Sequence, residues 1–403
     1  MEMHALEAAF LQVAETEIAR IGQWFYKTPM LISSARYEEL HTLQRLLYKA
    51  IRFFVTHYDE YESLLPLSPR ARKIVEIAAQ RPYRVGTYRP DFVIGQDRHI
   101  RVCEIGCRFP LDGFFYSGIS ELIANRLAAA QGVDQPTARY RRFLEHLTGY
   151  LGEFAQVRAL KSPADRPQDL RLYTQIFPNA GIPCTVHTPA EIAAQPDLLS
   201  NAAVIDEFNQ MDLEAFDEAV IEKLAAANSL NDLRTKFLIH DKRFLSVLSN
   251  REFLAHFLTG DESDFLTQHV APTYTRAQRP DLWEQARADK DGWILKPYLL
   301  GKSAGLLAGW VTEEEPWQAA FCSPAIEKMV LQPFIRQRQF VAPLDGRMYM
   351  DYVVGTFLCF DDDFLGPGIF RASSFPVTNQ GDDRKVATFV TEQPSLLKSR
   401  FVL

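Results

Sequence analysis

The segment Asp291–Trp310, DGWILKPYLLGKSAGLLAGW, constrains the chain most, because it joins a β-rich run and a lysine to a glycine-rich loop. Its Gly301-Lys302-Ser303 tripeptide is like the end of a P-loop, which requires G-x-x-x-x-G-K-[ST] between a strand and a helix. Lys296, however, takes the place of the first glycine. The residues after Ser303 contain too much glycine to form the phosphate-binding helix. The P-loop interpretation therefore fails on spacing and on context.

A phosphate site made of a lysine and a loop fits the same segment better. We expect WILKP to be a strand that ends near Lys296 and leaves its ammonium group free to meet a phosphate. Lys302 and Ser303 lie in the following loop, whose backbone N–H groups can cover a triphosphate. Further on, VLQPFI contains Gln332-Pro333-Phe334, which can offer a backbone donor and acceptor to an adenine edge. A plain strand–turn–strand would explain WILKP alone, but the order and spacing of the pieces favour an ATP site.

Composition narrows the class of protein. A chain of 403 residues can bury a large core and should divide into two or three structural units. The net charge of -7, without a block of Lys or Arg, argues against a nucleic-acid partner. No apolar run has the length to span a bilayer, and the N-terminal residues lack a signal-peptide layout. The five scattered cysteines are typical of reduced thiols. We therefore expect a cytoplasmic protein of enzyme size, without a membrane partner and with homo-oligomerisation left open.

The patterns of hydrophobic residues divide the chain into four parts. Residues 1–80 have apolar residues at helical spacing, and residues 81–150 contain two β-rich runs around a polar turn, followed by a helix. Residues 151–230 alternate strand and helix, which predicts a small α/β unit with parallel strands. Residues 231–403 begin with an expected helix carrying FLIHDKRFLSVL and continue into the glycine-rich loop and further strands. The predicted class is α/β, in the α+β sense.

Two carboxylates lie on the strands of the expected hairpin. YRPDFVIG contains Asp91 and HIRVCEIGCRF contains Glu104. If their alternation matches, both can face one metal ion; the alternative is an acidic pair that decorates a sheet face. Arg89 has the same parity as Asp91 and should project from the same face, where a salt bridge to either acid is an alternative to a role in the site.

Seven segments, taken in order, resemble the circularly permuted ATP-grasp ligases. The chain looks most like the synthetase domain of glutathionylspermidine and trypanothione synthetases, and more distantly like eukaryotic glutathione synthetase. The similarity extends from about Arg89 to the C-terminus. Its segments are R-P-D-F from Arg89, E-I-G from Glu104, FLIHDKRFLSVL, VAPTYT, the W-x-K-P strand with its glycine loop, VLQPFI, and a final run from GTFLCF through GPGIFRA and VTN to TFV.

The resemblance implies a permuted ATP-grasp fold with a helical N-terminal segment and a small inserted parallel α/β subdomain. It also implies a ligase that uses ATP to phosphorylate a substrate carboxylate, after which an amine attacks the acyl phosphate. The implied nucleotide contacts are Lys242 and Lys296, the implied Mg²⁺ ligands are Asp91 and Glu104, and the implied catalytic residues are Arg89 and Arg371.

Lys236 competes with Lys242 for the first nucleotide contact. The two lysines are six residues apart on an expected helix and should point to different faces, so only one can serve. The position of Lys242 just before FLSVL favours it.

Three departures from the family pattern fall in the metal and phosphate region. Gly106 stands where the family has an asparagine, Lys302 where it has an acid, and Ala372 where it has a glutamate. These changes make the site more positive, so we expect one magnesium ion, with Lys302 supplying part of the charge neutralisation. The leading hypothesis is an ATP-dependent carboxylate–amine ligase that acts on a small amino acid or peptide. The alternatives are a catalytically reduced protein that binds nucleotide in a regulatory or scaffold role, and a kinase-like enzyme that stops at the phosphorylated product.

Overall fold

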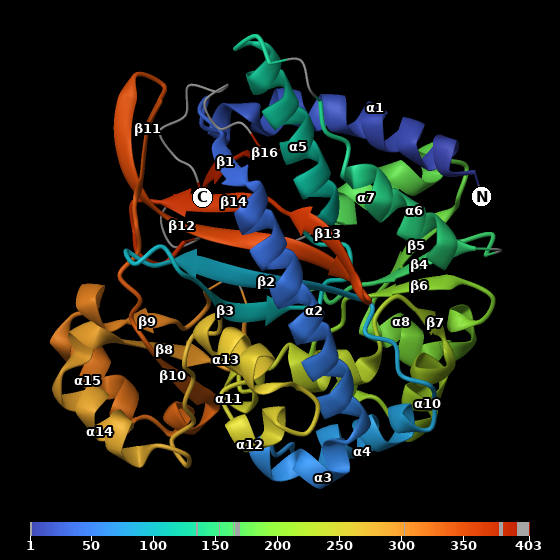
Figure 1. The fold of residues 1–403 in the computed structure, drawn as a ribbon. Helices are drawn as coiled ribbons and strands as arrows, with labels where there is room; N and C mark the ends of the chain where they lie inside the picture. Colours follow the sequence, from blue (N-terminus) through green and yellow to red (C-terminus); the bar gives the residue numbers. More distant parts are fainter. Residues whose placement is uncertain are drawn as a thin grey trace.

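The fold is built around a seven-stranded antiparallel sheet (Figure 1). The computed structural model describes residues 2–133, 136–152, 154–163, 165, 170–301, 303–378, 382–392 and 403. The main path of the sheet runs β15-β14-β12-β2-β3, and β11 and β13 also pair with β12. Its strands are β2 (Thr87–Ile94), β3 (Ile100–Gly106), β11 (Phe340–Leu344), β12 (Arg347–Phe360), β13 (Asp363–Pro367), β14 (Phe370–Ser373) and β15 (Arg384–Val386). The expected hairpin is therefore present, and it forms one side of the central sheet.

Helix α2 (Ser34–Thr56) crosses one face of this sheet (Figure 1). Its apolar residues recur every three or four positions, and Ser33 caps its start by accepting a hydrogen bond from the Arg36 N–H at 3.3 Å. The helix shares a buried core with inward-facing residues of the sheet, among them Phe92 and Phe357. The opposite face of β2, β3 and β14 is thereby left to line a cavity. The other N-terminal elements are α1 (Met3–Ile21), β1 (Met30–Ser33), α3 (Tyr58–Tyr61) and α4 (Pro69–Ala79).

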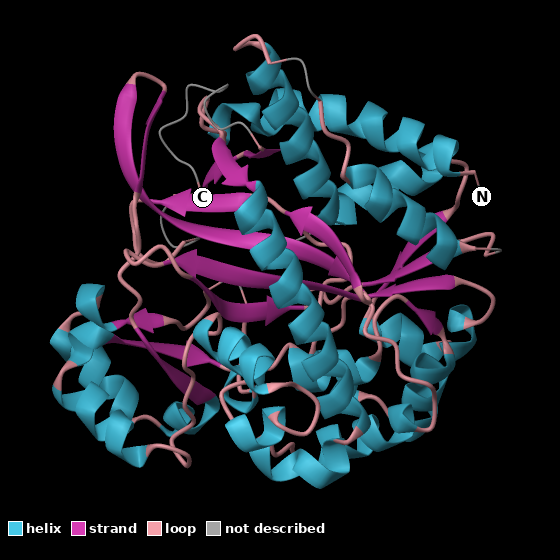
Figure 2. Ribbon diagram, viewed as in Figure 1, coloured by secondary structure: helices cyan, strands magenta, loops and turns pink. Residues whose placement is uncertain are grey.

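The middle of the chain forms a second, fully parallel sheet of order β5-β4-β6-β7, as the alternation of strands and helices predicts. Its strands are β4 (Val157–Leu160), β5 (Cys184–His187), β6 (Ala203–Asp206) and β7 (Asn228–Ser229). Between and before them come α5 (Phe114–Ala129), α6 (Tyr140–Leu151), α7 (Leu170–Asn179), α8 (Pro189–Ala194), α9 (Gln210–Ala215) and α10 (Glu218–Ala226). The remaining sheets are antiparallel, apart from the β1–β16 pair. The chain therefore combines a parallel sheet with antiparallel sheets and helices, which confirms the predicted α/β class in the α+β sense (Figure 2).

A third unit holds the glycine-rich segment. It consists of β8 (Trp293–Pro297), β9 (Leu307–Ala308) and β10 (Met329–Pro333), in the order β10-β8-β9, with its own small core around Trp283 and Trp317. The helices of this region are α11 (Phe244–Val247), α12 (Arg251–Leu254), α13 (Gly260–Gln268), α14 (Pro280–Ala288) and α15 (Glu314–Cys322); the last strand, β16 (Thr388–Thr391), pairs in parallel with β1. Among the described residues, no helix has both the length and the apolar character needed to cross a membrane.

The expected helix around Lys242 is wrong in one respect. The chain forms a π-helical turn over Thr235–Ile239 and only resumes as α11 at Phe244. Between them the buried Asp241 carboxylate accepts from the Arg243 N–H at 2.8 Å, which offers the backbone an alternative to the helical ladder. Lys242 therefore lies in a turn, so helical spacing does not determine the direction of its side chain.

Candidate active site

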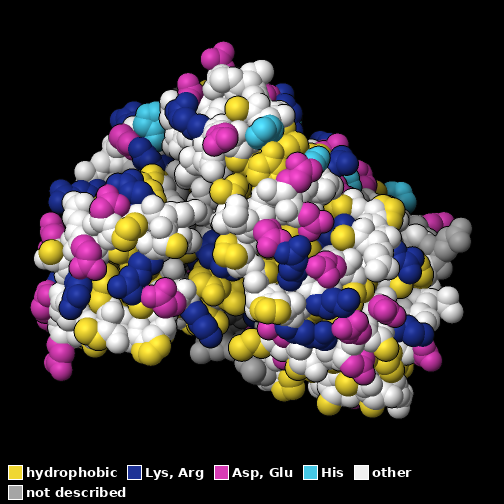
Figure 3. Space-filling view, turned by 90° about the horizontal axis from the view of Figure 1, so that it is seen from below, with side chains coloured by type: hydrophobic (Ala, Val, Ile, Leu, Met, Phe, Trp, Pro, Cys, Tyr) yellow, Lys and Arg dark blue, Asp and Glu magenta, His cyan; other side chains and the backbone are white. Residues whose placement is uncertain are grey.

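A cavity lies between the central sheet and the three-stranded sheet, and encloses about 160 Å³. From below, a hollow separates the part of the surface that contains the three-stranded sheet from the rest of the molecule (Figure 3). The cavity is lined by residues of both sheets and of two loops: Arg89, Asp91, Val93, Cys103, Glu104, Gly106, Phe109, Asp112, His240, Ile294, Lys296, Gly301, Ser303, Leu306, Gln332, Pro333, Phe334, Ile335, Gln337, Val354, Arg371, Pro376, Val377 and Thr378. Thus most residues that the sequence singled out lie around one space.

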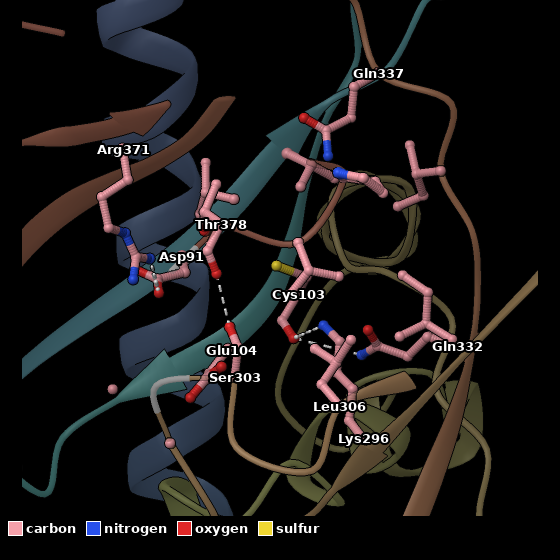
Figure 4. Close-up of a pocket in the computed structure, with 18 of the residues that line it drawn as sticks. Asp91, Cys103, Glu104, Lys296, Ser303, Leu306, Gln332, Gln337, Arg371 and Thr378 are labelled. Carbon is pink, nitrogen blue, oxygen red and sulfur yellow. Dashed lines mark hydrogen bonds and ion pairs between the residues drawn. The ribbon is translucent and has the colours of Figure 1, made fainter. Parts of the chain in front are cut away.

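The two carboxylates of the hairpin lie directly opposite each other. Asp91 on β2 pairs in register with Glu104 on β3, so their side chains share the cavity face of the sheet. The register shifts next to this pair, so that Cys103 is an extra residue on β3. The Cys103 carbonyl accepts from Lys296 Nζ at 3.3 Å and from Gln332 Nε2 at 3.4 Å (Figure 4). The bulge thereby joins the central sheet to the lysine of the other sheet.

Lys242 reaches one of these carboxylates, Glu104, from the turn before α11. Its Nζ lies 3.3 Å from Glu104 Oε1 and donates to the Leu300 carbonyl at 2.5 Å, so it also contacts the start of the glycine-rich loop. Burial would raise the pKa of Glu104, but the positive charges of Lys242 and Lys296 overcome it and lower that pKa to about 2. Glu104 is therefore an ionised carboxylate with two ammonium groups gathered around it.

Lys236, the competing lysine, does not line the cavity. Its Nζ lies 2.6 Å from Asp206 Oδ2, and both side chains are only 1% exposed. Burial lowers the pKa of Lys236, and Asp206 opposes that effect. The ion pair lies at the end of β6 in the parallel sheet. Of the two lysines, the structure brings only Lys242 to the carboxylates.

The two arginines have different partners. Arg371 on β14 lies 2.5 Å from Asp91 (Figure 4), and Asp91 and Glu104 raise its pKa although burial opposes this. Arg89 pairs instead with Asp112 at 3.1 Å, so neither salt bridge considered from the sequence forms for it. A Cβ added at Gly106 would lie 3.2 Å from Arg89 Nη2, so the missing side chain makes room for this guanidinium.

Gly301, Ser303 and Leu306 of the glycine-rich loop line the cavity. Ser303 lines the cavity and donates from Oγ to the Thr378 carbonyl at 2.9 Å (Figure 4), which links this loop to the segment after β14. Ser303 itself has φ 59°, a left-handed conformation uncommon outside glycine. Lys302 lies outside the described residues.

The expected adenine contacts lie at the end of β10. The Gln332 side chain is 2% exposed and donates to Thr273 Oγ1 at 2.8 Å, while Pro333 and Phe334 line the cavity. The Phe334 N–H already donates to the Gly292 carbonyl at 2.7 Å. A purine edge would therefore have to take its backbone donor from a residue after Phe334, such as Ile335.

The donor set suits one Mg²⁺ ion. Two carboxylates on one face are a normal protein contribution for this cation, which fills its remaining positions with phosphate oxygens and water. In the described parts of the chain, no group of three His, Cys, Asp or Glu side chains is placed to hold a metal. The Ala372 departure does not affect this set, because Ala372 faces the core beside Phe370, on the face opposite Arg371.

The sequence missed several residues of the cavity, and His240 is the clearest case. Its side chain is 4% exposed, and burial together with Lys242 lowers its pKa to about 3, so it is neutral. It stands two residues before Lys242 in FLIHDKRFLSVL, and that proximity was the available signal. Asp112 and Thr378 had no such signal, since their contacts are with residues far away in the chain.

The chain is similar to several known proteins. A family model described as "AnkG N-terminal domain" matches residues 43–238. The chain is 22% identical over 421 aligned positions to "ATP-grasp enzyme ankG" of Aspergillus thermomutatus, covering 86% of this chain and 84% of that protein. Its fold is similar to the apo structure of a glutathione synthetase-like effector (GSS30) from Globodera pallida, with a TM-score of 0.60, 11% identity, and coverage of 97% and 98% of the two chains. The chain is thus similar to a protein named as an ATP-grasp enzyme, and its fold is glutathione synthetase-like.

Proposed function

We propose that the protein is an ATP-dependent carbon–nitrogen ligase that joins a small carboxylic acid to an amine through an acyl phosphate. The observation that carries the proposal is the convergence of Lys242 and Lys296, from two separate segments, on the face where Asp91 and Glu104 lie opposite each other. Ammonium groups and carboxylates around one space can bind a triphosphate and a hard cation together. This arrangement also favours the permuted ATP-grasp subfamily expected from the sequence.

The two sides of the cavity differ in the chemistry of their lining residues. Ile294, Leu306 and Phe334 give the cavity an apolar lining on the side of the three-stranded sheet, which suits a nucleobase. Lys296 lies beside Leu306 and Gln332 and suits the phosphates, while Arg371, beside Asp91 on the other side of the site, and Arg89 suit the acid (Figure 4). The acid and the γ-phosphate would then meet between the two groups of cations.

Little covalent chemistry is required of the protein. In the first step, a carboxylate oxygen attacks the γ-phosphorus, and the bond to the β-phosphate oxygen breaks with its electron pair leaving on ADP. In the second, the amine attacks the acyl carbon, phosphate leaves with the bonding electron pair, and the amine nitrogen loses a proton. The protein's part is to hold the reacting groups in line and to offset their negative charge. The cations Lys242, Lys296, Arg89 and Arg371 suit that task.

Asp91 and Glu104 would hold one Mg²⁺, which supplies charge neutralisation on the phosphates. Both carboxylates have cationic partners, so binding the ion would require Arg371 and Lys242 to turn toward the nucleotide. Lys302 stays a proposed phosphate contact. Calorimetric titration of ATP with and without Mg²⁺ tests it, because Lys302→Ala should weaken binding, and unchanged binding would refute the role.

Nucleotide binding is the first test of the function. Lys296→Met should bind a non-hydrolysable ATP analogue at least about 10-fold more weakly than the wild type in calorimetry, since a charge-assisted hydrogen bond is lost. Lys223→Met is the control, because that lysine is half exposed and pairs with Asp197 on the parallel unit. Equal binding by wild type and Lys296→Met, or none by the wild type, would refute the nucleotide site.

Turnover separates the ligase from its alternative. The carboxylates of the site are already ion-paired and Gly106 supplies no ligand, which favours a nucleotide-binding protein with reduced catalysis as the second candidate. Purified protein should be incubated with ATP and pools of amino acids and amines, and ADP, phosphate and product masses measured. A new amide supports the ligase. ADP release with a phosphorylated product indicates a kinase-like enzyme, and intact ATP binding without turnover supports the second candidate.

A further inference from the structure

Two cations lie directly opposite each other at the edge of the central sheet. Arg371 on β14 is paired in register with Lys385 on β15, so their side chains share one face. Like charges in this position destabilise a sheet. Both side chains are largely buried, with exposed fractions of 25% for Arg371 and 16% for Lys385. Such a pair needs a negative charge nearby.

The acids of the protein meet this need only in part. Asp91 lies against Arg371, but it also faces Glu104 and belongs to the candidate metal site. Lys385 pairs with Asp383, whose side chain is 54% exposed, so solvent weakens that interaction. Burial and the charge of Arg371 lower the pKa of Lys385, although Asp383 opposes them. The ammonium group therefore has less compensating charge than its burial demands.

Lys385 is also close to the cavity, because its partner in register, Arg371, lines it. Its charge interacts with Arg371 and Asp112, which both line that cavity. Asp112 in turn holds Arg89 at 3.1 Å. Arg89, Arg371 and Lys385 therefore gather on the side of the cavity that holds Asp91 and Asp112, where the proposed reaction would place the acid.

We propose that Arg371 and Lys385 form a two-cation seat for the carboxylate of the acid substrate, and then for the acyl phosphate made from it. This inference rests on the proposed function. A planar guanidinium and a neighbouring ammonium group can together accept both oxygens of a carboxylate and can follow its charge as a phosphoryl group is added. An anion in this seat would then offset the repulsion that remains between the two cations. Lys385 is a positioning residue for the acid, in addition to Arg371.

The competing explanation gives Lys385 a structural role, in which its pair with Asp383 fixes the connection between β14 and β15. The two explanations predict opposite effects of removing the charge. Lys385→Met keeps most of the aliphatic side chain and removes the repulsion, so the seat predicts a higher melting temperature in buffer without polyvalent anions. A structural ion pair predicts a lower one.

The experiment measures melting temperatures with and without inorganic phosphate as the anionic probe. A non-hydrolysable ATP analogue and Mg²⁺ are present throughout, so that phosphate does not report on the nucleotide subsites. Phosphate should raise the melting temperature of the wild type and of Lys385→Arg, and should leave that of Lys385→Met unchanged. Lys223→Met, a half-exposed lysine on α10, serves as the control and should respond like the wild type.

The proposal is overturned if Lys385→Met is less stable than the wild type and still responds to phosphate, or if phosphate stabilises none of the proteins. Calorimetry with the ATP analogue separates this failure from that of the proposed function. The wild type and Lys385→Met should bind the analogue with similar affinity. If the wild type does not bind it, the proposed function fails, and the seat for the acid substrate fails with it. If the analogue binds and phosphate has no effect, only the seat is refuted.

Discussion

Replacing Lys236 and Lys242 separately should produce opposite phenotypes, because Lys236 pairs with Asp206 in the parallel unit whereas Lys242 pairs with Glu104, which lines the cavity. Lys236→Met leaves the Asp206 carboxylate, which is 1% exposed, without its cation. Breaking a buried ion pair on one side costs about 3–5 kcal/mol of the free energy of unfolding. Removing both charges, in Lys236→Met with Asp206→Leu, should recover much of that loss, since the desolvated charge is gone.

Lys242→Met should behave differently. Its ammonium group shares Glu104 with Lys296, so Glu104 keeps a cationic partner and the free energy of unfolding should change by only about 1 kcal/mol. The affinity for an ATP analogue should fall about 10- to 100-fold, which corresponds to the 1.5–3 kcal/mol of a charge-assisted hydrogen bond.

Urea denaturation and calorimetric titration of both variants provide the two measurements. Lys236→Met should lose stability, but its folded fraction should bind the analogue with wild-type affinity. Lys242→Met should keep most of its stability and bind the analogue more weakly. The reasoning is refuted if Lys236→Met is as stable as the wild type, or if Lys242→Met binds the analogue with wild-type affinity.

Two further predictions concern the neutral histidine and a tightly packed glycine. His240 has an ordinary pKa of 6.5 that falls to about 3 in the folded state, so between these values the unfolded chain binds the extra proton. The free energy of unfolding should then drop on acidification by up to about 1.4 kcal/mol per pH unit for that proton. Urea melts at several pH values should show a weaker dependence of this free energy on pH for His240→Gln than for the wild type. His41→Gln, which changes an exposed histidine, should show the wild-type dependence. A Cβ added at Gly309 would lie 1.9 Å from the Lys290 carbonyl oxygen, so Gly309→Ala should lose about 2–3 kcal/mol in thermal or urea melts, whereas Gly292→Ala, which meets nothing within 4 Å, should lose about 1 kcal/mol or less; equal losses would contradict the packing argument.

Local features of the site could be predicted from the sequence because local rules determine them. Alternation along two strands around a polar turn places Asp91 and Glu104 on one face, and the register agrees. The bulge at Cys103 follows no such rule. The carbonyl of this extra residue accepts the hydrogen bond from Lys296 Nζ. The break before α11 was also missed, because the periodicity of apolar residues does not report that Asp241 bonds to the local backbone.

Contacts between distant segments could not be derived from sequence patterns. Arg371 and Asp91 are 280 residues apart, and only the resemblance to a family suggested that they share a site. The choice between Lys236 and Lys242 depended on Asp206, which belongs to a different sheet. Partners of this kind are set by how sheets pack, and a single sequence carries no local signal for them.

Glu104 explains how so many cations can be held together before any nucleotide is bound. Lys242 and Lys296 come from different segments and would repel each other across the cavity if no anion lay between them. The Glu104 carboxylate, with a pKa near 2, stays ionised and holds both ammonium groups where a phosphate can later meet them. Lys296 already lines the cavity, so this cation would need little reorganisation when charge develops on a transferring phosphoryl group, whereas Lys242 would turn from Glu104 toward the nucleotide. The same carboxylate would then be released toward Mg²⁺, so its two roles would follow one another without moving the sheet that carries it.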